Sequence, residues 1–279
     1  MGGVADGEPG VRVVKWLTAL GGGVAIMLVL AGLALAAPGG AQGMAQGHRA
    51  GADPLASSAA PLAGKTVGID PGHNGHNYLY PGRINRLVWN GREWEACDTT
   101  GTQTRGGYTE PRFTFAVARY LRADLRSLGA HVVMTRTTNS GVGPCVNRRA
   151  RILNRAHSKV AIDIHADGGP GWGRGFTILE PVKDGPNDKV IGSSERFGRY
   201  LRTAMRRHTR MPVSDYYGKD GIIHRNDLAG LNLTTVPKVL IECGNMRNRQ
   251  DARLLTARWF QRRLAKAMTT AIVRFLTGG

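Results

Sequence analysis

Three apolar runs of the sequence each lead to a side chain that can bind a metal ion or exchange a proton. The runs and the side chains that follow them are 66–69 with His73, 160–164 with His165, and 239–241 with Glu242. Parallel α/β sheets gather their reactive groups at the carboxyl ends of their strands. A single histidine after a strand is more often structural than catalytic. Three runs of the same design, however, predict one shared site.

A fourth residue completes a set of ligands for a catalytic metal. Glu110 follows a Gly-Gly-Tyr-Thr loop and opens a segment with helical spacing. Two histidines and a glutamate form a ligand set of catalytic zinc sites that keep a fourth position for water. Imidazole and carboxylate suit Zn²⁺ better than Mg²⁺ or Ca²⁺. We therefore predict that His73, Glu110 and His165 bind zinc and that Glu242 is the general base, a combination suited to amide hydrolysis.

Other residues compete for these roles. His76 lies three residues after His73 and could replace it as a ligand, although His73 follows the strand more directly. Asp70 or Asp163 could orient a ligand imidazole from behind. Glu110 could instead be a first-turn carboxylate that the helix dipole favours.

The segments around these residues alternate between strand-like and helical patterns. Strands are predicted at 65–69, 131–135, 160–164, 175–179 and 239–241, and helices at 110–128, 146–156, 193–207 and 251–275. This alternation predicts βαβ units and therefore an α/β fold around a mostly parallel sheet. For the helix at 110–128, Thr109 is a plausible N-cap, Pro111 suits the first turn and Gly129 suits the C-terminal end.

Two segments interrupt this alternation. Residues 78–108 are polar and aromatic, and they contain Asn90 and Gly91 between apolar and aromatic flanks, a pattern that predicts a β-hairpin. Because this insertion follows His73 and precedes Glu110, we expect it near the site. Residues 215–235 are predicted to form a loop before the last strand. In that loop, His224 and Arg225 are either substrate contacts or solvated surface residues.

The N-terminal part is expected to direct export. Arg12 and Lys15 precede 22 uncharged residues at 16–37, and Ala34-Leu35-Ala36 fits a signal-peptide cleavage site. The alternative is an uncleaved membrane anchor, because 22 uncharged residues are enough to span a bilayer. We therefore divide the chain into a signal peptide or anchor at 1–37, a flexible linker at 38–61 and a folded domain at 62–279. Either reading places the domain outside the cytoplasm, in the periplasm or cell wall.

The chain of 279 residues has a net charge of +18, all of it in the part that follows the apolar segment. Such a protein is attracted to anionic wall polymers or membrane surfaces, or its charge only keeps the surface solvated. No helix-turn-helix, zinc-finger or aromatic stacking pattern occurs, which argues against nucleic acid as a partner. Because no interface feature is evident, we expect a monomer, with membrane contact only through an uncleaved N-terminal segment.

The three cysteines have different surroundings. Cys97 and Cys145 lie in segments typical of loops, whereas Cys243 directly follows an apolar run and is expected to be buried. In an oxidising compartment the two loop cysteines are the expected pair, with Cys243 as a free thiol, although the sequence excludes none of the three pairings. A cysteine-ligated zinc site is not expected, because no Cys-x-x-Cys occurs.

Several short motifs, in their order along the chain, resemble those of the zinc-dependent N-acetylmuramoyl-L-alanine amidases of the amidase 3 type. They are Gly-Ile-Asp-Pro-Gly-His-Asn-Gly at 68–75, Thr-Glu at 109–110, Thr-Arg at 135–136, Ile-His-Ala at 164–166 and Val-Leu-Ile-Glu at 239–242. The resemblance extends over residues 62–275. The aromatic insertion and the expected pair of loop cysteines resemble mycobacterial and actinobacterial members.

The resemblance implies a three-layer α/β/α fold with a central, mostly parallel mixed sheet. It implies cleavage of the amide between the lactyl group of N-acetylmuramic acid and L-alanine of the peptidoglycan stem. It also implies that His73, Glu110 and His165 are zinc ligands and that Glu242 is catalytic. His165 is followed by Ala-Asp-Gly rather than the more usual Ala-Asn, so substrate contacts there are expected to differ. No segment matches the helical insertion that blocks the zinc in regulated members, so we expect an open site.

Two other functions are compatible with the sequence. One is a non-catalytic peptidoglycan-binding or activator protein that keeps the fold and the metal. The other is a zinc peptidase that cuts within the stem peptide. The products of a digest distinguish all three, because only the amidase releases an intact stem peptide.

Overall fold

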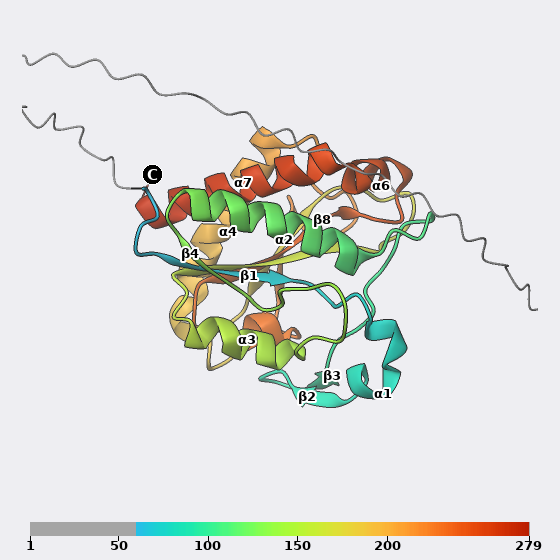
Figure 1. Ribbon diagram of the computed structural model, residues 1–279, viewed down its shortest axis with the longest axis horizontal. Coiled ribbons are helices and arrows are strands. Elements are labelled where there is room, and N and C mark those ends of the chain that lie inside the picture. Colours follow the sequence, from blue (N-terminus) through green and yellow to red (C-terminus); the bar gives the residue numbers. More distant parts are fainter. Residues whose placement is uncertain (1–59, 279) are drawn as a thin grey trace, which may run out of the picture. The chain divides into compact units, whose positions relative to one another are not determined.

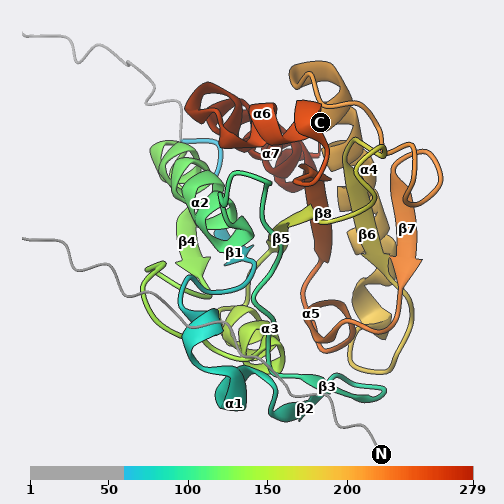
Figure 2. The ribbon, with the colours of Figure 1, turned by 90° about the vertical axis from the view of Figure 1, so that its right-hand side faces the viewer.

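The computed structural model describes residues 60–278, which are built around a sheet of six strands. The order across the sheet is β4-β1-β5-β8-β6-β7, and every neighbouring pair is parallel except β6 with β8 (Figure 2). The strands are β1 (Thr66–Pro71), β4 (His131–Met134), β5 (Val160–Asp167), β6 (Thr177–Pro181), β7 (Ile222–Arg225) and β8 (Lys238–Asn245). The predicted mostly parallel, mixed sheet is confirmed.

Helices cover both faces of this sheet, which confirms the predicted three layers (Figure 1). One face carries α2 (Glu110–Ser127), α4 (Ile191–His208) and α7 (Arg258–Thr277), with α6 (Arg249–Thr256) beside α7. The other face carries α3 (Val146–Arg155) and α5 (Ala229–Asn232). Three short helices lie in the connections: η1 (Asn77–Leu79), α1 (Pro81–Ile84) and η2 (Asp188–Val190).

The main core lies between the sheet and the layer of α2, α4 and α7. Its fully buried side chains include Ile69, Phe113, Ile162, Phe197 and Leu264. A smaller cluster on the other face contains Leu153, Ala161 and Val236. Because both faces of the sheet are covered, its central strands are buried on both sides, and this is why they are largely apolar runs in the sequence.

Two predictions about the later part of the chain were wrong. The single helix predicted at 251–275 is two helices, α6 and α7, because Ala257 between them has an extended backbone (φ −82°, ψ 122°). The loop predicted at 215–235 contains the edge strand β7 and the short helix α5. Both elements have only four residues, which is too few to produce a periodic pattern in the sequence.

The predicted hairpin is present as β2 (Leu87–Trp89) paired with antiparallel β3 (Trp94–Ala96). Its turn has four residues, and the Asn90 side-chain oxygen accepts hydrogen bonds from the backbone N–H groups of Arg92 and Glu93, both at 2.8 Å. A disulfide between Cys97 and Cys145 joins the end of the hairpin to the start of α3. The third cysteine, Cys243, is a buried free thiol.

The predicted signal peptide or anchor and nearly all of the predicted linker lie outside the described residues. Within residues 60–278, no helix has the length and apolar character needed to cross a membrane.

One buried carboxyl group lies on the face of the sheet that packs against α4. Glu180 of β6 is 3% exposed, and a Cβ atom at Gly198 of α4 would collide with its Oε1. This oxygen has no hydrogen-bond partner among residues 60–278, while Oε2 lies 3.5 Å from Nε2 of the exposed His224 of β7. Burial and the nearby Glu195 raise the pKa of Glu180 to about 7, and Arg199 only partly opposes this rise.

We expect Glu180→Gln to stabilise the protein at pH 8 and to change its stability little at pH 4. The folded-state pKa of about 7 lies above the unfolded value of 4.5, so the wild-type chain loses stability as the pH rises through this interval. The neutral amide avoids that loss, which amounts to about 1–3 kcal/mol at pH 8. Urea unfolding at both pH values measures the effect. An equal stabilisation at pH 4 would contradict the proposed origin in ionisation.

Candidate active site

The ends of β1 and β5 and the first turn of α2 meet at one edge of the sheet. His73 follows β1, His165 lies near the end of β5, and Glu110 is the first residue of α2. One ligand atom from each of these side chains lies within 4.8 Å of the others. Glu110 Oε2 is 3.2 Å from His73 Nε2, and Glu110 Oε1 is 2.9 Å from His165 Nδ1. The structure therefore brings together the three residues for which the sequence predicted a shared metal.

Glycines make room for this close approach. A Cβ atom at Gly72 would collide with the imidazole of His165, and one at Gly101 would lie 2.7 Å from Glu110 Oε2. His73 itself has a left-handed backbone (φ 57°), which is uncommon outside glycine and costs energy. Arg149 Nη2 donates a hydrogen bond of 2.9 Å to the His73 carbonyl and so helps to hold this conformation.

A buried aspartate lies behind each imidazole. His73 Nδ1 is 3.1 Å from Asp98 Oδ1, and His165 Nε2 is 3.3 Å from Asp163 Oδ1. A carboxylate in this position fixes the tautomer and the ring orientation of a ligand histidine. The other nitrogen of each ring is then the one that faces Glu110.

The two aspartates belong to a buried network of charges. Lys238 Nζ lies 3.1 Å from Asp163 Oδ2 and 2.9 Å from Asp70 Oδ2. Asp70 Oδ1 in turn accepts from Arg149 at 2.9 Å, and the same guanidinium donates to Asp98 Oδ2 at 3.2 Å. Every member is less than 10% exposed. The orientation of both imidazoles is thus connected to one continuous chain of ion pairs.

The charges in this cluster shift one another's pKa values. Burial alone would lower the pKa of His73, but the carboxylates of Glu110 and Asp98 outweigh it and raise this pKa to about 9. Burial would also lower the pKa of His165, but the carboxylates of Asp163 and Glu110 outweigh it and raise this pKa well above its ordinary value. Burial would raise the pKa of Glu110, but the two histidines lower it strongly. The site therefore favours an ionised Glu110.

Glu242 lies beside the cluster but outside its network of hydrogen bonds. It stands on β8 directly across from His165 of β5 in the sheet register. Its Oε2 is buried and has no hydrogen-bond partner among the described residues. Burial, as the largest cause, raises the pKa of Glu242 to about 8. An unpartnered carboxyl group with a raised pKa is typical of an acid or base that acts on a ligand.

His73, Glu110, His165 and Glu242 line one cavity of about 620 Å³. Its far wall includes Arg225 of β7, which is paired with Asp227 and donates to the Tyr217 hydroxyl.

Besides the three aspartates of the buried network, Asp167 and Glu95 line this cavity. Asp167, in the segment that departs from the usual family pattern, accepts a hydrogen bond of 2.6 Å from the Tyr216 hydroxyl. Glu95, on the hairpin, accepts a hydrogen bond of 2.9 Å from the backbone N–H of Ala229.

Of the remaining residues that the sequence suggested for the site, some lie at the cluster or its cavity and others do not. His76 is half-buried and lies outside the three-residue cluster, with its ring centroid 6.3 Å from that of Tyr78. His224 is exposed and is not among the residues that line the cavity, whereas Arg225 is. Asp163 lies behind the His165 imidazole, as one alternative suggested, while Asp70 reaches the imidazoles through Lys238 and Arg149.

Sequence reasoning missed three members of the network: Asp98, Arg149 and Lys238. Lys238 left a signal, because it is a charged residue at the start of an apolar, buried strand. Arg149 is one of four arginines at 146–155, and nothing in the sequence distinguishes it from its exposed neighbours. Asp98 lies in an irregular segment whose position depends on the hairpin.

The chain is similar to known proteins over nearly all of its described part. Residues 67–274 match the family model described as N-acetylmuramoyl-L-alanine amidase. The chain is 37% identical over 238 residues to the N-acetylmuramoyl-L-alanine amidase Rv3717 of Mycobacterium tuberculosis, covering 81% of this chain and 94% of the relative.

Two solved structures of mycobacterial amidases have the same fold. Ami1 of Mycobacterium smegmatis aligns with a TM-score of 0.74 and 37% identity, over 78% of this chain and 99% of its own. The apo form of Ami1 from Mycobacterium abscessus aligns with a TM-score of 0.73 and 39% identity, over 77% of this chain and 100% of its own.

The buried network predicts a large loss of stability when its central cation is removed. We expect Lys238→Met to lower the free energy of unfolding by about 3–5 kcal/mol, because it leaves buried carboxylates without a counter-charge. Urea unfolding measures this loss. As a matched control, Arg92→Met breaks the exposed Arg92–Asp184 pair (3.5 Å), and this should cost less than about 1 kcal/mol. Similar losses in the two variants would show that Lys238 is not required to balance buried charge.

Proposed function

The chain belongs to the N-acetylmuramoyl-L-alanine amidase family, and from this premise we propose that it is a zinc-dependent hydrolase. Its substrate would be the amide between the lactyl group of N-acetylmuramic acid and L-alanine of peptidoglycan stem peptides. One observation carries the proposal. Three side chains with the donor atoms of a catalytic zinc site converge in a cavity that also holds an unpartnered buried carboxyl group.

The donor set fits zinc. His73, Glu110 and His165 offer two imidazole nitrogens and a carboxylate, which a borderline cation prefers to the all-oxygen sets of Mg²⁺ or Ca²⁺. Asp98 and Asp163 support the imidazoles from behind, as is usual for ligand histidines. When bound, zinc supplies a Lewis acid that polarises the scissile carbonyl and acidifies water.

Glu242 is the proposed catalytic residue. Its carboxylate would take a proton from the attacking water and pass it to the leaving nitrogen of L-alanine. This role needs a carboxyl group that is free of other partners and close to the ligands. Glu242 meets both conditions, because its Oε2 is unpartnered among residues 60–278 and its position is opposite His165.

The cellular setting is also part of the proposal. A peptidoglycan substrate requires that the domain act outside the cytoplasm, which agrees with the export signal or anchor proposed at 1–37. The cavity wall would then contact muramyl peptides, with Arg225 and Asp167 among its polar groups. Anionic wall polymers are proposed as further partners of the basic surface, and a monomer is the proposed state.

We expect Glu242→Gln to abolish muramyl-peptide cleavage while zinc is retained. The amide keeps the size of the side chain but cannot take the proton, so the rate should fall by roughly 10²–10⁴-fold. Product analysis by mass spectrometry measures the activity, and elemental analysis measures the zinc. Glu180→Gln is the matched control, because it changes a buried carboxyl group outside the cavity, and it should keep both zinc and activity.

Three results would overturn the proposal in different ways. Full activity of Glu242→Gln would exclude the proposed base. A shortened stem peptide as product would identify a peptidase. Sacculus binding by the wild-type protein with no product at all would identify a non-catalytic binding protein.

A further inference from the structure

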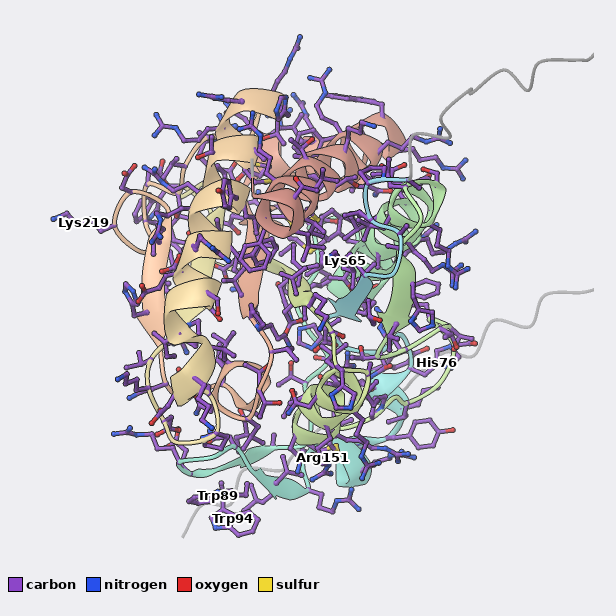
Figure 3. All side chains as sticks on the ribbon, turned by 90° about the vertical axis from the view of Figure 1, so that its left-hand side faces the viewer. Lys65, His76, Trp89, Trp94, Arg151 and Lys219 are labelled. Atoms are coloured by element: carbon purple, nitrogen blue, oxygen red, sulfur yellow. A yellow bond between two sulfur atoms is a disulfide. The ribbon has the colours of Figure 1, made fainter. Side chains whose placement is uncertain are left out.

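The outer side of the β2–β3 hairpin carries large apolar side chains in solvent. Leu87, Trp89 and Trp94 are 60%, 45% and 64% exposed, whereas Val88 on the opposite side is 8% exposed. Trp89 and Trp94 pair across the strands, with ring centroids 5.7 Å apart. Both project outward at the lower edge of the molecule (Figure 3). Contiguous exposed apolar groups of this kind usually mark an interaction surface.

Helix α3, whose N-terminal end is joined to the hairpin, carries exposed arginines. Arg148, Arg151 and Arg155 are exposed and line a surface hollow of about 430 Å³ together with Ile152. Within the described part of the chain, none of these three guanidinium groups has a carboxylate within 4.0 Å. Arg151 appears at the same lower edge as the two tryptophans (Figure 3). The three guanidinium groups are therefore available to bind an external anion.

Covalent and hydrogen bonds hold the hairpin and α3 together. The Cys97–Cys145 disulfide joins them, and the Val146 backbone N–H donates a bond of 2.8 Å to the Cys97 carbonyl. Val88 packs against both cysteines. The hairpin and the start of α3 are therefore held together, and we call their exposed apolar and basic side chains the hairpin–α3 face: Leu87, Trp89, Trp94, Arg148, Arg151 and Arg155.

The hairpin–α3 face is separate from the proposed catalytic cavity. Glu95 lines that cavity and is paired with Val88, on the inner side of the hairpin. Trp89 and Trp94 do not line it. From the hairpin, the cavity is thus lined by Glu95 and by Ala96 at the end of β3, whereas Leu87, Trp89 and Trp94 lie outside its lining.

We propose that the hairpin–α3 face binds the surface of an anionic phospholipid membrane. Indole rings combine an apolar body with a polar N–H and are enriched at membrane interfaces. Guanidinium groups bind phosphate through paired hydrogen bonds and are attracted to anionic leaflets. The exposed Leu87 also favours a lipid surface over a glycan. Glycan-binding platforms use aromatic rings and uncharged polar groups, whereas an aliphatic side chain is better accommodated at the boundary of the acyl chains.

Vesicle binding tests this proposal without relying on catalysis. The mycobacterial structures align over 99% and 100% of their own chains with about this part, so a chain of this extent folds alone. The fragment 60–279, which lacks the apolar N-terminal segment, should sediment with phosphatidylglycerol–phosphatidylcholine vesicles. The double variant Trp89→Ala/Trp94→Ala should bind on the order of tenfold or more weakly, because it keeps the charge but loses two interfacial indoles.

Matched charge variants separate this face from the general basic surface. Arg148→Gln/Arg151→Gln/Arg155→Gln should weaken binding on the order of a hundredfold at moderate salt. Replacing three arginines of α2, on the opposite layer, removes the same charge and should change binding only a few-fold: Arg119→Gln/Arg122→Gln/Arg126→Gln. Thermal melting and cleavage of a soluble muramyl peptide should be unchanged in the tryptophan variant, which checks its fold.

Three outcomes would overturn the proposal. The wild-type fragment could fail to bind anionic vesicles. The tryptophan variant could bind them as tightly as wild type, in which case net charge alone causes binding. It could also keep vesicle binding but lose binding to purified sacculi, which would identify a glycan surface. None of these results affects the proposed amidase reaction, which is measured on soluble substrate.

Discussion

The active-site geometry depends on burying five charges without leaving one unpaired. An isolated ion is very costly inside a protein, and a buried pair is tolerated only where its hydrogen bonds are satisfied. Here Lys238 and Arg149 alternate with Asp70, Asp98 and Asp163, so that each of these three carboxylates contacts at least one cation or imidazole. The position of each charge is set by its neighbours. The imidazole rings of His73 and His165, which contact the two ends of the network, are therefore held in fixed positions.

Among residues 60–278, the network leaves one acidic group beside the cluster, Glu242, with an unpartnered buried oxygen. Lys238, Asp70 and Asp163 come from β8, β1 and β5, so ion pairs cross-link three adjacent strands next to the cluster of His73, Glu110 and His165. Glu242 lies four residues beyond Lys238 on β8, yet its Oε2 receives no hydrogen bond from residues 60–278. The paired charges of the network are suited to hold the imidazoles in place, whereas the unpartnered Glu242 is suited to act on a bound molecule. Different environments for neighbouring acids are a general way of assigning them different roles.

The sequence predicted the site residues that follow apolar runs and missed those whose role depends on contacts with distant parts of the chain. His73, His165 and Glu242 were visible because each follows a continuous apolar run, which is typical of a buried parallel strand, although β5 and β8 continue past His165 and Glu242 to Asp167 and Asn245. Asp98 and Arg149 belong to segments whose local sequence carries no such marker, since their partners are 25 and more than 70 residues away. The break between α6 and α7 was invisible for a similar reason, because an extended alanine has no distinctive sequence.

The hairpin shows how one local turn can determine two surfaces. Side chains alternate between the sides of a strand, so a shift of one residue in the pairing would exchange the cavity-lining Glu95 with the exposed Trp94. Asn90 prevents such a shift: its side chain holds the backbone of the four-residue turn, and its Nδ2 donates to the Asp227 carbonyl at 3.2 Å. Asp227 in turn is paired with Arg225 on the cavity wall. A buried amide at the turn therefore fixes the inner wall of the cavity and the outward direction of the tryptophans together, because neither can move without breaking its hydrogen bonds.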